Sequence, residues 1–239
     1  MYYLIETKDQ LERFFKDEGN KCYLQFITNN DETHPKLQSL CALYIYSFSK
    51  EKGFIINLNH PEAFELDLPL DYLKSYTNIF VKEKTKALLH LPHLPYTDIQ
   101  SIYYLLKNEP LDPLPKTAAH IFYERKFGAN NVNKIIPLAK HYEALTQEFT
   151  ALNPYITNYK SEASNKWYNE ILTPTLAKMV SEGIKINSDF QKHFDIKEKF
   201  SIEEDKIYGW YNFCTTTGRP TNNFNKINFS ALKHDSGER

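Results

Sequence analysis

The sequence predicts an α/β domain followed by a mostly helical region. Three runs rich in β-branched and aromatic residues have strand lengths and are joined by polar or turn-rich links. These runs are residues 21–28, 40–48 and 53–58. From Asp98 onward the apolar residues recur instead at helical spacing, as Ile99, Ile102 and Leu106 do. Strands in the front half with helices behind them indicate an α/β domain with a helical extension.

The front half divides into short elements. Residues 2–6 (YYLIE) form a strand, Thr7 caps the helix that follows, and Gly19 ends that helix. The three strand-like runs then form a meander, and a helix is expected around residues 69–75. We expect TNIFVKE, residues 77–83, to be a further strand that joins the sheet in parallel.

The back half is predicted to be helical. Asp98 caps the first helix, and the proline-rich stretch 110–115 breaks it. NPY at 153–155 is expected to form a turn, and a longer helix over roughly 160–182 ends at Gly183. The other helical segments are residues 117–128 and 132–152. We place the main domain boundary near residue 150. A second division at residue 205 separates the helical region from the last segment, so the three ranges are 1–150, 151–205 and 206–239.

Composition limits the classes of function. Hydrophobic residues make up 41% and charged residues 25%, as in ordinary globular proteins. The net charge of −1 means that any nucleic-acid contact depends on local patches. No signal peptide or long apolar run is recognisable, so we expect a cytoplasmic location and no membrane partner. Three scattered cysteines favour reduced thiols over a zinc site.

The most unusual segment is 208–232, YGWYNFCTTTGRPTNNFNKINFSAL. It contains no Asp or Glu, is dense in Thr and Asn, and begins with several aromatic residues. Gly218 and Pro220 flank Arg219 and imply a sharp bend that exposes its guanidinium. Such a loop suits a phosphate or a minor-groove base edge, and a solvated loop with an ordinary arginine is the alternative.

TTTGRPTNNFNKIN resembles the family A DNA polymerase pattern T-x-T-G-R-x-S-S followed by an N-L-Q element. The resemblance implies a thumb-to-palm segment that grips the primer-terminal duplex, with Arg219 reading minor-groove acceptors common to all correct pairs. Asn222 and Asn228 stand where the family has Ser and Gln. The DNA-binding residues expected from the resemblance are Thr215, Thr217, Arg219, Thr221, Asn222 and Asn228.

A second match lies upstream of that motif. EILTPTLAKMVSEGIKIN, residues 170–187, resembles the family's E-x-P-L helix that ends in M-E-x-x-G-I-x-I-D. Only residues 188–207 separate it from the aromatic segment. We therefore expect the long helical hairpin of the thumb to be largely deleted.

In that family the domain before the thumb is a proofreading exonuclease, whose acidic groups hold two divalent metals. YTDIQSIYYLL, residues 96–106, resembles its D-T-x-x-x-x-Y-L-L helix, with Asp98 as a structural acid. The first strand should carry D-x-E but supplies Gln25, Phe26, Ile27 and Thr28. Lys84 and Lys86 stand at the expected second ligand position and Lys140 at the third. The resemblance therefore implies a degenerate RNase H-like exonuclease domain without a metal site.

The sequence thus predicts an α/β exonuclease-like domain, a shortened thumb and a thumb-to-palm DNA-binding segment. We expect the N-terminal part or a subunit of a family A DNA-directed DNA polymerase acting in DNA replication. No catalytic residue is expected here, because the palm carboxylates that bind Mg²⁺ lie beyond Arg239 in such enzymes. The expected partners are primer–template DNA and a palm–fingers chain.

Two alternatives of other classes remain open. One is a non-catalytic DNA-binding or replisome-docking module, and the other is a divergent, active 3′–5′ exonuclease. The abundance of Lys over Arg, with much Asn and Ile, suggests an AT-rich coding sequence, as in many viruses and low-GC bacteria. We expect a viral origin, with the host cytoplasm as its location.

Overall fold

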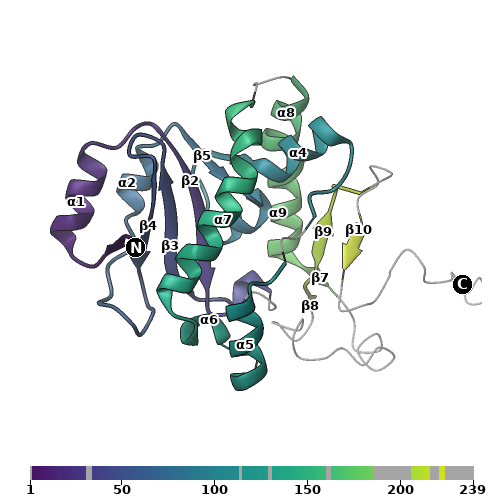
Figure 1. Cartoon of the computed structure of the whole chain (residues 1–239). Coiled ribbons are helices and arrows are strands. Elements are labelled where there is room, and N and C mark those ends of the chain that lie inside the picture. The colour runs from purple at the N-terminus through teal and green to yellow at the C-terminus, as the bar shows by residue number, and fades with distance from the viewer. Residues whose placement is uncertain are drawn as a thin grey trace, which may run out of the picture.

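A six-stranded mixed sheet forms the centre of the molecule in the computed structural model (Figure 1). The structure describes residues 2–30, 34–112, 115–128, 131–159, 163–185, 206–215 and 221–223. The strand order is β1-β4-β3-β2-β5-β6. The strands are β1 (Leu4–Ile5), β2 (Lys21–Thr28), β3 (Leu40–Ser47), β4 (Lys52–Asn57), β5 (Asn78–Val81) and β6 (Tyr96–Asp98).

The strand pairing follows the predicted meander. β2, β3 and β4 pair antiparallel in sequence order, and β5 pairs with β2 in parallel, as expected for residues 77–83. β1 joins β4 in parallel, and β6 adds to the far side of β5. The prediction missed β6, because three residues are too few to show a period of two. The predicted α/β class of this domain is therefore confirmed.

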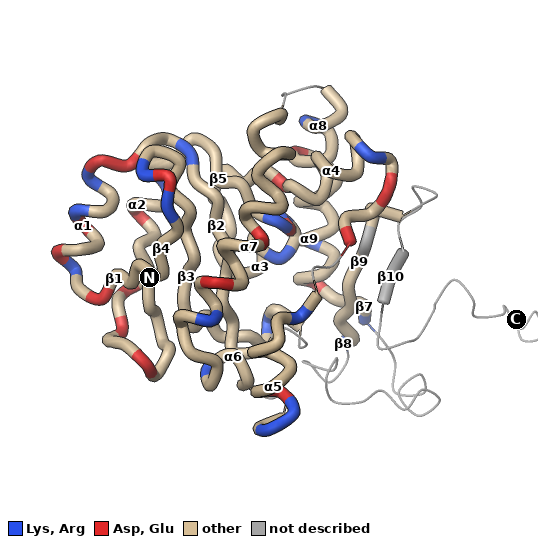
Figure 2. Tube along the Cα trace, in the orientation of Figure 1, with Lys and Arg blue, Asp and Glu red and all other residues tan. Residues whose placement is uncertain are grey.

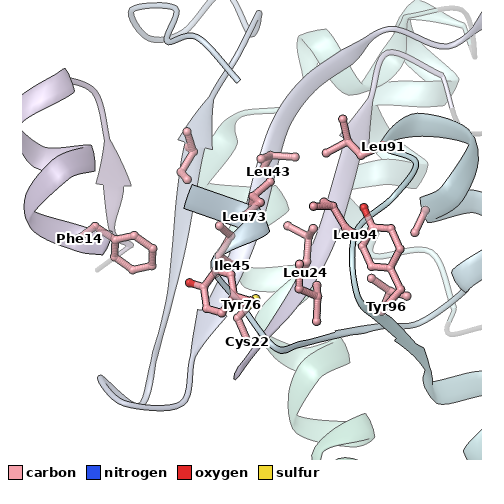
Figure 3. Packing of buried hydrophobic residues seen from close by; sticks show 14 of the residues in the cluster. Phe14, Cys22, Leu24, Leu43, Ile45, Leu73, Tyr76, Leu91, Leu94 and Tyr96 are labelled. Carbon is pink, nitrogen blue, oxygen red and sulfur yellow. The ribbon is translucent and has the colours of Figure 1, made fainter. Parts of the chain in front are cut away.

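Successive strand residues point to opposite faces of the sheet, and each face has its own core. On β2, Cys22 and Leu24 pack with one core, whereas Tyr23 packs with the other. On β3, Leu43 and Ile45 belong to the first core (Figure 3). Helices cover both faces, so the domain has three layers.

The first core is covered by three helices from the front half. These are α1 (Lys8–Lys16), α2 (Leu70–Lys74) and α3 (Lys84–His90). Thr7 caps α1 as predicted: its hydroxyl accepts from the Gln10 N–H, and the Gln10 side chain accepts from the Thr7 N–H. A 3-10 turn, η1 (Pro35–Leu37), follows β2.

The second core is covered by helices α4 (Ile99–Lys107) and α7 (Leu138–Thr157). Between them in the chain lie α5 (Ala118–Phe127) and α6 (Val132–Ile135). α7 runs through 153–155, so the predicted turn there is wrong. Leu152 and Ile156 are buried on either side of Pro154 and hold the last turns against the sheet. Pro154 stands near the helix end, so the backbone bond that it removes is one of few.

The predicted helix over 160–182 contains α8 (Ala163–Trp167), a π-helical turn η2 (Tyr168–Leu172) and α9 (Thr173–Glu182). Gly183 ends α9 with a φ of 70°, as predicted. A Cβ at this position would lie 2.8 Å from the Tyr208 ring. Glycine is therefore required both by the backbone conformation and by the close approach of Tyr208.

Two small strand pairs complete the described chain. β7 (Ile184–Lys185) pairs with β8 (Lys206–Ile207), and β9 (Trp210–Asn212) pairs with β10 (Thr221–Asn223), both antiparallel. Phe213 and Cys214 are buried in a third core with Tyr104 of α4 and Leu176 of α9. The segment around β9 is thus packed into the front part of the chain.

Candidate functional site

The position of the expected nuclease site is a cavity of about 190 Å³ between β2, the end of β5 and α7. Gln25 lies on the same face of β2 as Tyr23, because the two residues are two apart in a strand. Lys82 and Glu83 follow β5 directly, and Glu148 reaches the cavity from α7. Four polar side chains from three elements therefore meet at one place.

The Glu148 carboxylate is the centre of this group. Its Oε1 accepts hydrogen bonds from the Tyr23 hydroxyl at 2.8 Å and from the Gln25 amide at 2.7 Å. Its Oε2 lies 2.6 Å from the Lys82 ammonium. The Glu148 side chain is 12% exposed, so these are largely desolvated, charge-assisted contacts. Burial, together with the Glu148 charge, raises the pKa of Tyr23 well above its usual value and keeps this phenol a donor.

This donor set does not fit a pair of divalent metals. Mg²⁺ and similar ions need several oxygen ligands, and two-metal sites are built from carboxylates. Here Lys82 and Lys86 bring positive charge to the cavity, and Gln25 brings an amide. The Lys82 ammonium supplies the positive charge opposite Glu148. Among the described residues, no group of three or more His, Cys, Asp or Glu side chains could hold a metal ion.

Two of the three basic residues expected at the ligand positions lie elsewhere. Lys140 lies on the outer surface of α7 and pairs with Glu143 at 2.8 Å. Glu148, also on α7, accepts hydrogen bonds from Tyr23 and Gln25 of β2, so this helix brings an acidic side chain to the cavity. Lys84 is buried, and its ammonium donates to the carbonyls of Tyr96 and Asn169, each at 2.8 Å. Lys86 does line the cavity, as expected.

Asp98 stands at the N-cap position of α4, as expected, but its side chain makes no capping hydrogen bond to that helix. It is buried, and its carboxylate accepts from the Lys84 backbone N–H at 3.0 Å and from the Ser101 hydroxyl. Its own N–H donates to the Asn169 side chain at 2.7 Å. Burial raises the pKa of Asp98 to about 6. These contacts connect α3, β6 and the π-helical turn.

A larger cavity of about 360 Å³ adjoins the first, and Phe26, Leu145 and Glu148 line both. Its other walls include Pro115, Lys116, Thr117 and His120 at the start of α5. The cleft therefore extends from the end of β5, across α7, to α5.

The predicted DNA-binding segment is only partly described. The Thr215 carbonyl accepts a hydrogen bond from the Tyr104 hydroxyl of α4 at 3.0 Å. Thr221 and Asn222 stand in β10, opposite Asn212 and Tyr211 of β9. Thr217, Arg219 and Asn228 lie outside the described residues. The two strands that flank the TGR motif are thus paired, and its first residues are tied to α4.

Tyr208 is a core residue and not an exposed stacking platform. It is fully buried, beside His34 at 5.3 Å between ring centroids and beneath the Lys36 ammonium. Burial lowers the pKa of His34 to about 4, so this ring is neutral near pH 7. Trp210 lies 6.0 Å from the same histidine. Tyr208 therefore serves packing, whereas Trp210 is only partly buried.

Sequence reasoning missed Glu148 and Lys82. The signal for Glu148 was the pattern of α7, in which an acidic residue stands beside the buried residues Phe149 and Leu152 on the sheet-facing side. An acid on an apolar helix face needs a partner. The partner could not be found without knowing that β2 and β5 are neighbours.

Comparison with known proteins gives weak likenesses. No protein-family model matches the sequence, and no curated protein matches it. The structure of Trypanosoma brucei RNase D in complex with RNA U12 has a TM-score of 0.43 and 16% identity, and covers 67% of this chain. The chain spans 63% of that relative's length. Escherichia coli RNase D, an exoribonuclease involved in structured RNA processing, has a TM-score of 0.31 and 16% identity, over 71% of this chain and 54% of its own.

No helix among the described residues is long and apolar enough to cross a membrane.

Proposed function

We propose that this chain is the DNA-binding front part of a family A-like DNA polymerase, with an exonuclease-like domain that supports DNA binding and does not cleave. In this proposal Arg219 and its neighbours hold the primer-terminal duplex. A palm–fingers chain or a C-terminal continuation supplies the carboxylates that bind Mg²⁺. The chain would act in the cytoplasm, that of the host if its origin is viral.

One observation carries the proposal: the segment that leads into the TGR motif is built into the core. Cys214 is buried, Phe213 packs beside Tyr104, and the Tyr104 hydroxyl holds the Thr215 carbonyl. A loop that must position one guanidinium in a groove needs rigid flanks. The contacts of Phe213, Cys214 and Thr215 provide a rigid flank on one side of the motif. A solvated loop without a binding role would not need buried residues beside it.

The polar group in the cleft supports the non-catalytic part of the proposal. Lys82 neutralises Glu148, and Gln25 stands where the resemblance places an acid. Among the described residues, the carboxylates that line this cavity are Glu83 and Glu148, and a two-metal site uses more than these two. The cleft residues instead stabilise the contact between β2, β5 and α7.

The test is binding of a blunt-ended primer–template duplex, measured by fluorescence anisotropy. We expect Arg219→Ala to weaken binding roughly tenfold or more, the loss of one good groove contact. Arg13→Ala, on the exposed face of α1, is the matched control and should leave binding unchanged. Equal affinity of the Arg219 variant and the wild type would refute the proposed role of the motif.

The second candidate is a divergent 3′–5′ exonuclease. It is favoured by the fact that Glu83 and Glu148 both line the cavity at the end of β5. It predicts trimming of labelled single-stranded DNA or RNA with Mg²⁺ or Mn²⁺, abolished by EDTA and by Glu148→Gln. The proposed function predicts no trimming under the same conditions.

A further inference from the structure

Helix α5 differs from the other long helices, because none of its 10 residues is buried. Surface helices normally bury one apolar stripe against the core. Here three large apolar side chains face solvent: Ile121 is 39% exposed, Phe122 57% and Phe127 48%. Neighbouring exposed apolar side chains of this size are typical of a binding surface.

Two cationic side chains, Arg125 and Lys126, lie beside the phenylalanine rings of α5. The Lys126 ammonium is 5.8 Å from the centroid of Phe122 and 5.1 Å from that of Phe127. Arg125 is exposed beside it, and within the described part of the chain no carboxylate forms an ion pair with either cation. Glu124, the one acid of α5, is engaged by Lys116 at 2.9 Å. The end of α5 is accordingly marked by basic residues in Figure 2.

The shape of this surface also suits a ligand. Ile121, Phe122, Arg125 and Lys126 line a shallow hollow of about 440 Å³ on α5 itself. At its other end, the helix begins at the mouth of the larger cleft, which Thr117 and His120 line. An extended ligand lying along α5 would therefore pass from the hollow toward the cleft.

We propose that α5 binds single-stranded nucleic acid. Bases would stack on Phe122 and Phe127, while Arg125 and Lys126 contact the phosphates. Aromatic side chains alternating with cations are how proteins hold single strands without reading sequence, because every base has a π-face. The excess of cations over carboxylates favours a polyanion over an apolar protein partner. This site shares no residue with the TGR segment, so it stands independently of the duplex binding proposed above.

The experiment is anisotropy titration of a fluorescein-labelled 12-nucleotide oligothymidylate at several salt concentrations. The double variant Phe122→Ala/Phe127→Ala should bind at least tenfold more weakly than the wild type, since two stacking positions are lost. Lys126→Gln should lower the slope of log affinity against log salt by about 0.7, the value for one phosphate contact on a single strand. Because these side chains are exposed, the variants should retain the wild-type circular dichroism spectrum and melting temperature.

The controls separate this site from others. Phe64→Ala removes an 80%-exposed ring from the loop between β4 and α2 and should not change binding. Blunt duplex binding should survive the α5 variants and depend on Arg219 instead. Single-strand affinity that is unchanged in the double variant would overturn the proposal. The proposal would also be overturned if sedimentation showed a dimeric wild type and a monomeric double variant with the same affinity for oligothymidylate. That result would make α5 a self-association surface.

Discussion

Replacing Glu148 by glutamine tests whether this carboxylate is structural. In the wild type, the Glu148 carboxylate accepts hydrogen bonds from Tyr23 and Gln25 and forms an ion pair with Lys82. A hydrogen bond to a charged group contributes about 1.5–3 kcal/mol and a neutral one about 0.5–1.5, so two weakened bonds cost about 2 kcal/mol. The new amide also turns a donor toward Lys82, which is 27% exposed and can partly rehydrate. We expect a total loss of about 2–3 kcal/mol in the free energy of unfolding.

The assay is urea unfolding followed by circular dichroism, together with thermal melting. In a chain of this size, about 2–3 kcal/mol corresponds to a fall of roughly 5–10 °C in Tm. Glu143→Gln, which removes an exposed partner of Lys140 from the same helix, should change stability by less than about 0.5 kcal/mol. A double-mutant cycle of Lys82→Met with Glu148→Leu should give a coupling energy of about 1–3 kcal/mol.

A catalytic carboxylate would behave differently. Where acidic groups are gathered to hold metal, their repulsion destabilises the protein without metal, and an amide relieves it. Glu148→Gln at or above wild-type stability would therefore refute the structural role argued for Glu148 and favour the nuclease candidate.

Three further predictions rest on other residues. Burial raises the pKa of Asp98 to about 6, so the folded state holds this proton more tightly than the unfolded state, and the contribution of Asp98 to stability is greatest below about pH 4. About 3 kcal/mol of this contribution should be lost between pH 4 and pH 6 in urea titrations of the wild type, and the Asp98→Asn variant should not show that loss. Gly183→Ala should lower the free energy of unfolding by about 1–3 kcal/mol through a clash with Tyr208. Gly128→Ala, whose Cβ would meet nothing within 4 Å, should lower it by about 1 kcal/mol. Equal losses for the two variants in thermal melts would exclude the clash. In the assembled polymerase, Arg219→Lys should extend primers as poorly as Arg219→Ala, roughly tenfold to a hundredfold below wild type, and a near-normal lysine variant would indicate a phosphate contact instead.

The sheet could be predicted because its signals are local. The runs of β-branched and aromatic residues in β2 and β3 show in the sequence, and Gly183 ends α9 for a reason visible in one residue. The parallel pairing of β5 was also predicted and is confirmed. The helix through Pro154 was not, since proline normally marks a break and only the buried neighbours reveal that the helix continues.

The site was harder because it depends on distant neighbours. The pattern placed the third ligand position at Lys140, which lies on the exposed side of α7, whereas the helix presents Glu148, two turns later, to the sheet. The burial of Tyr208 was not predicted, because its place in the core depends on the space that Gly183 leaves for its ring. The assignment of Arg219 to DNA stays a prediction from the motif.

The proposed function requires that the chain hold DNA without cutting it. The most direct measurement incubates the purified chain with a 5′-labelled primer–template in Mg²⁺ or Mn²⁺, and reads binding by gel shift and primer length on a denaturing gel. We predict a shifted complex in which the primer keeps its full length over hours. Stepwise 3′ shortening that EDTA abolishes, and that Glu148→Gln also abolishes, would contradict the claim.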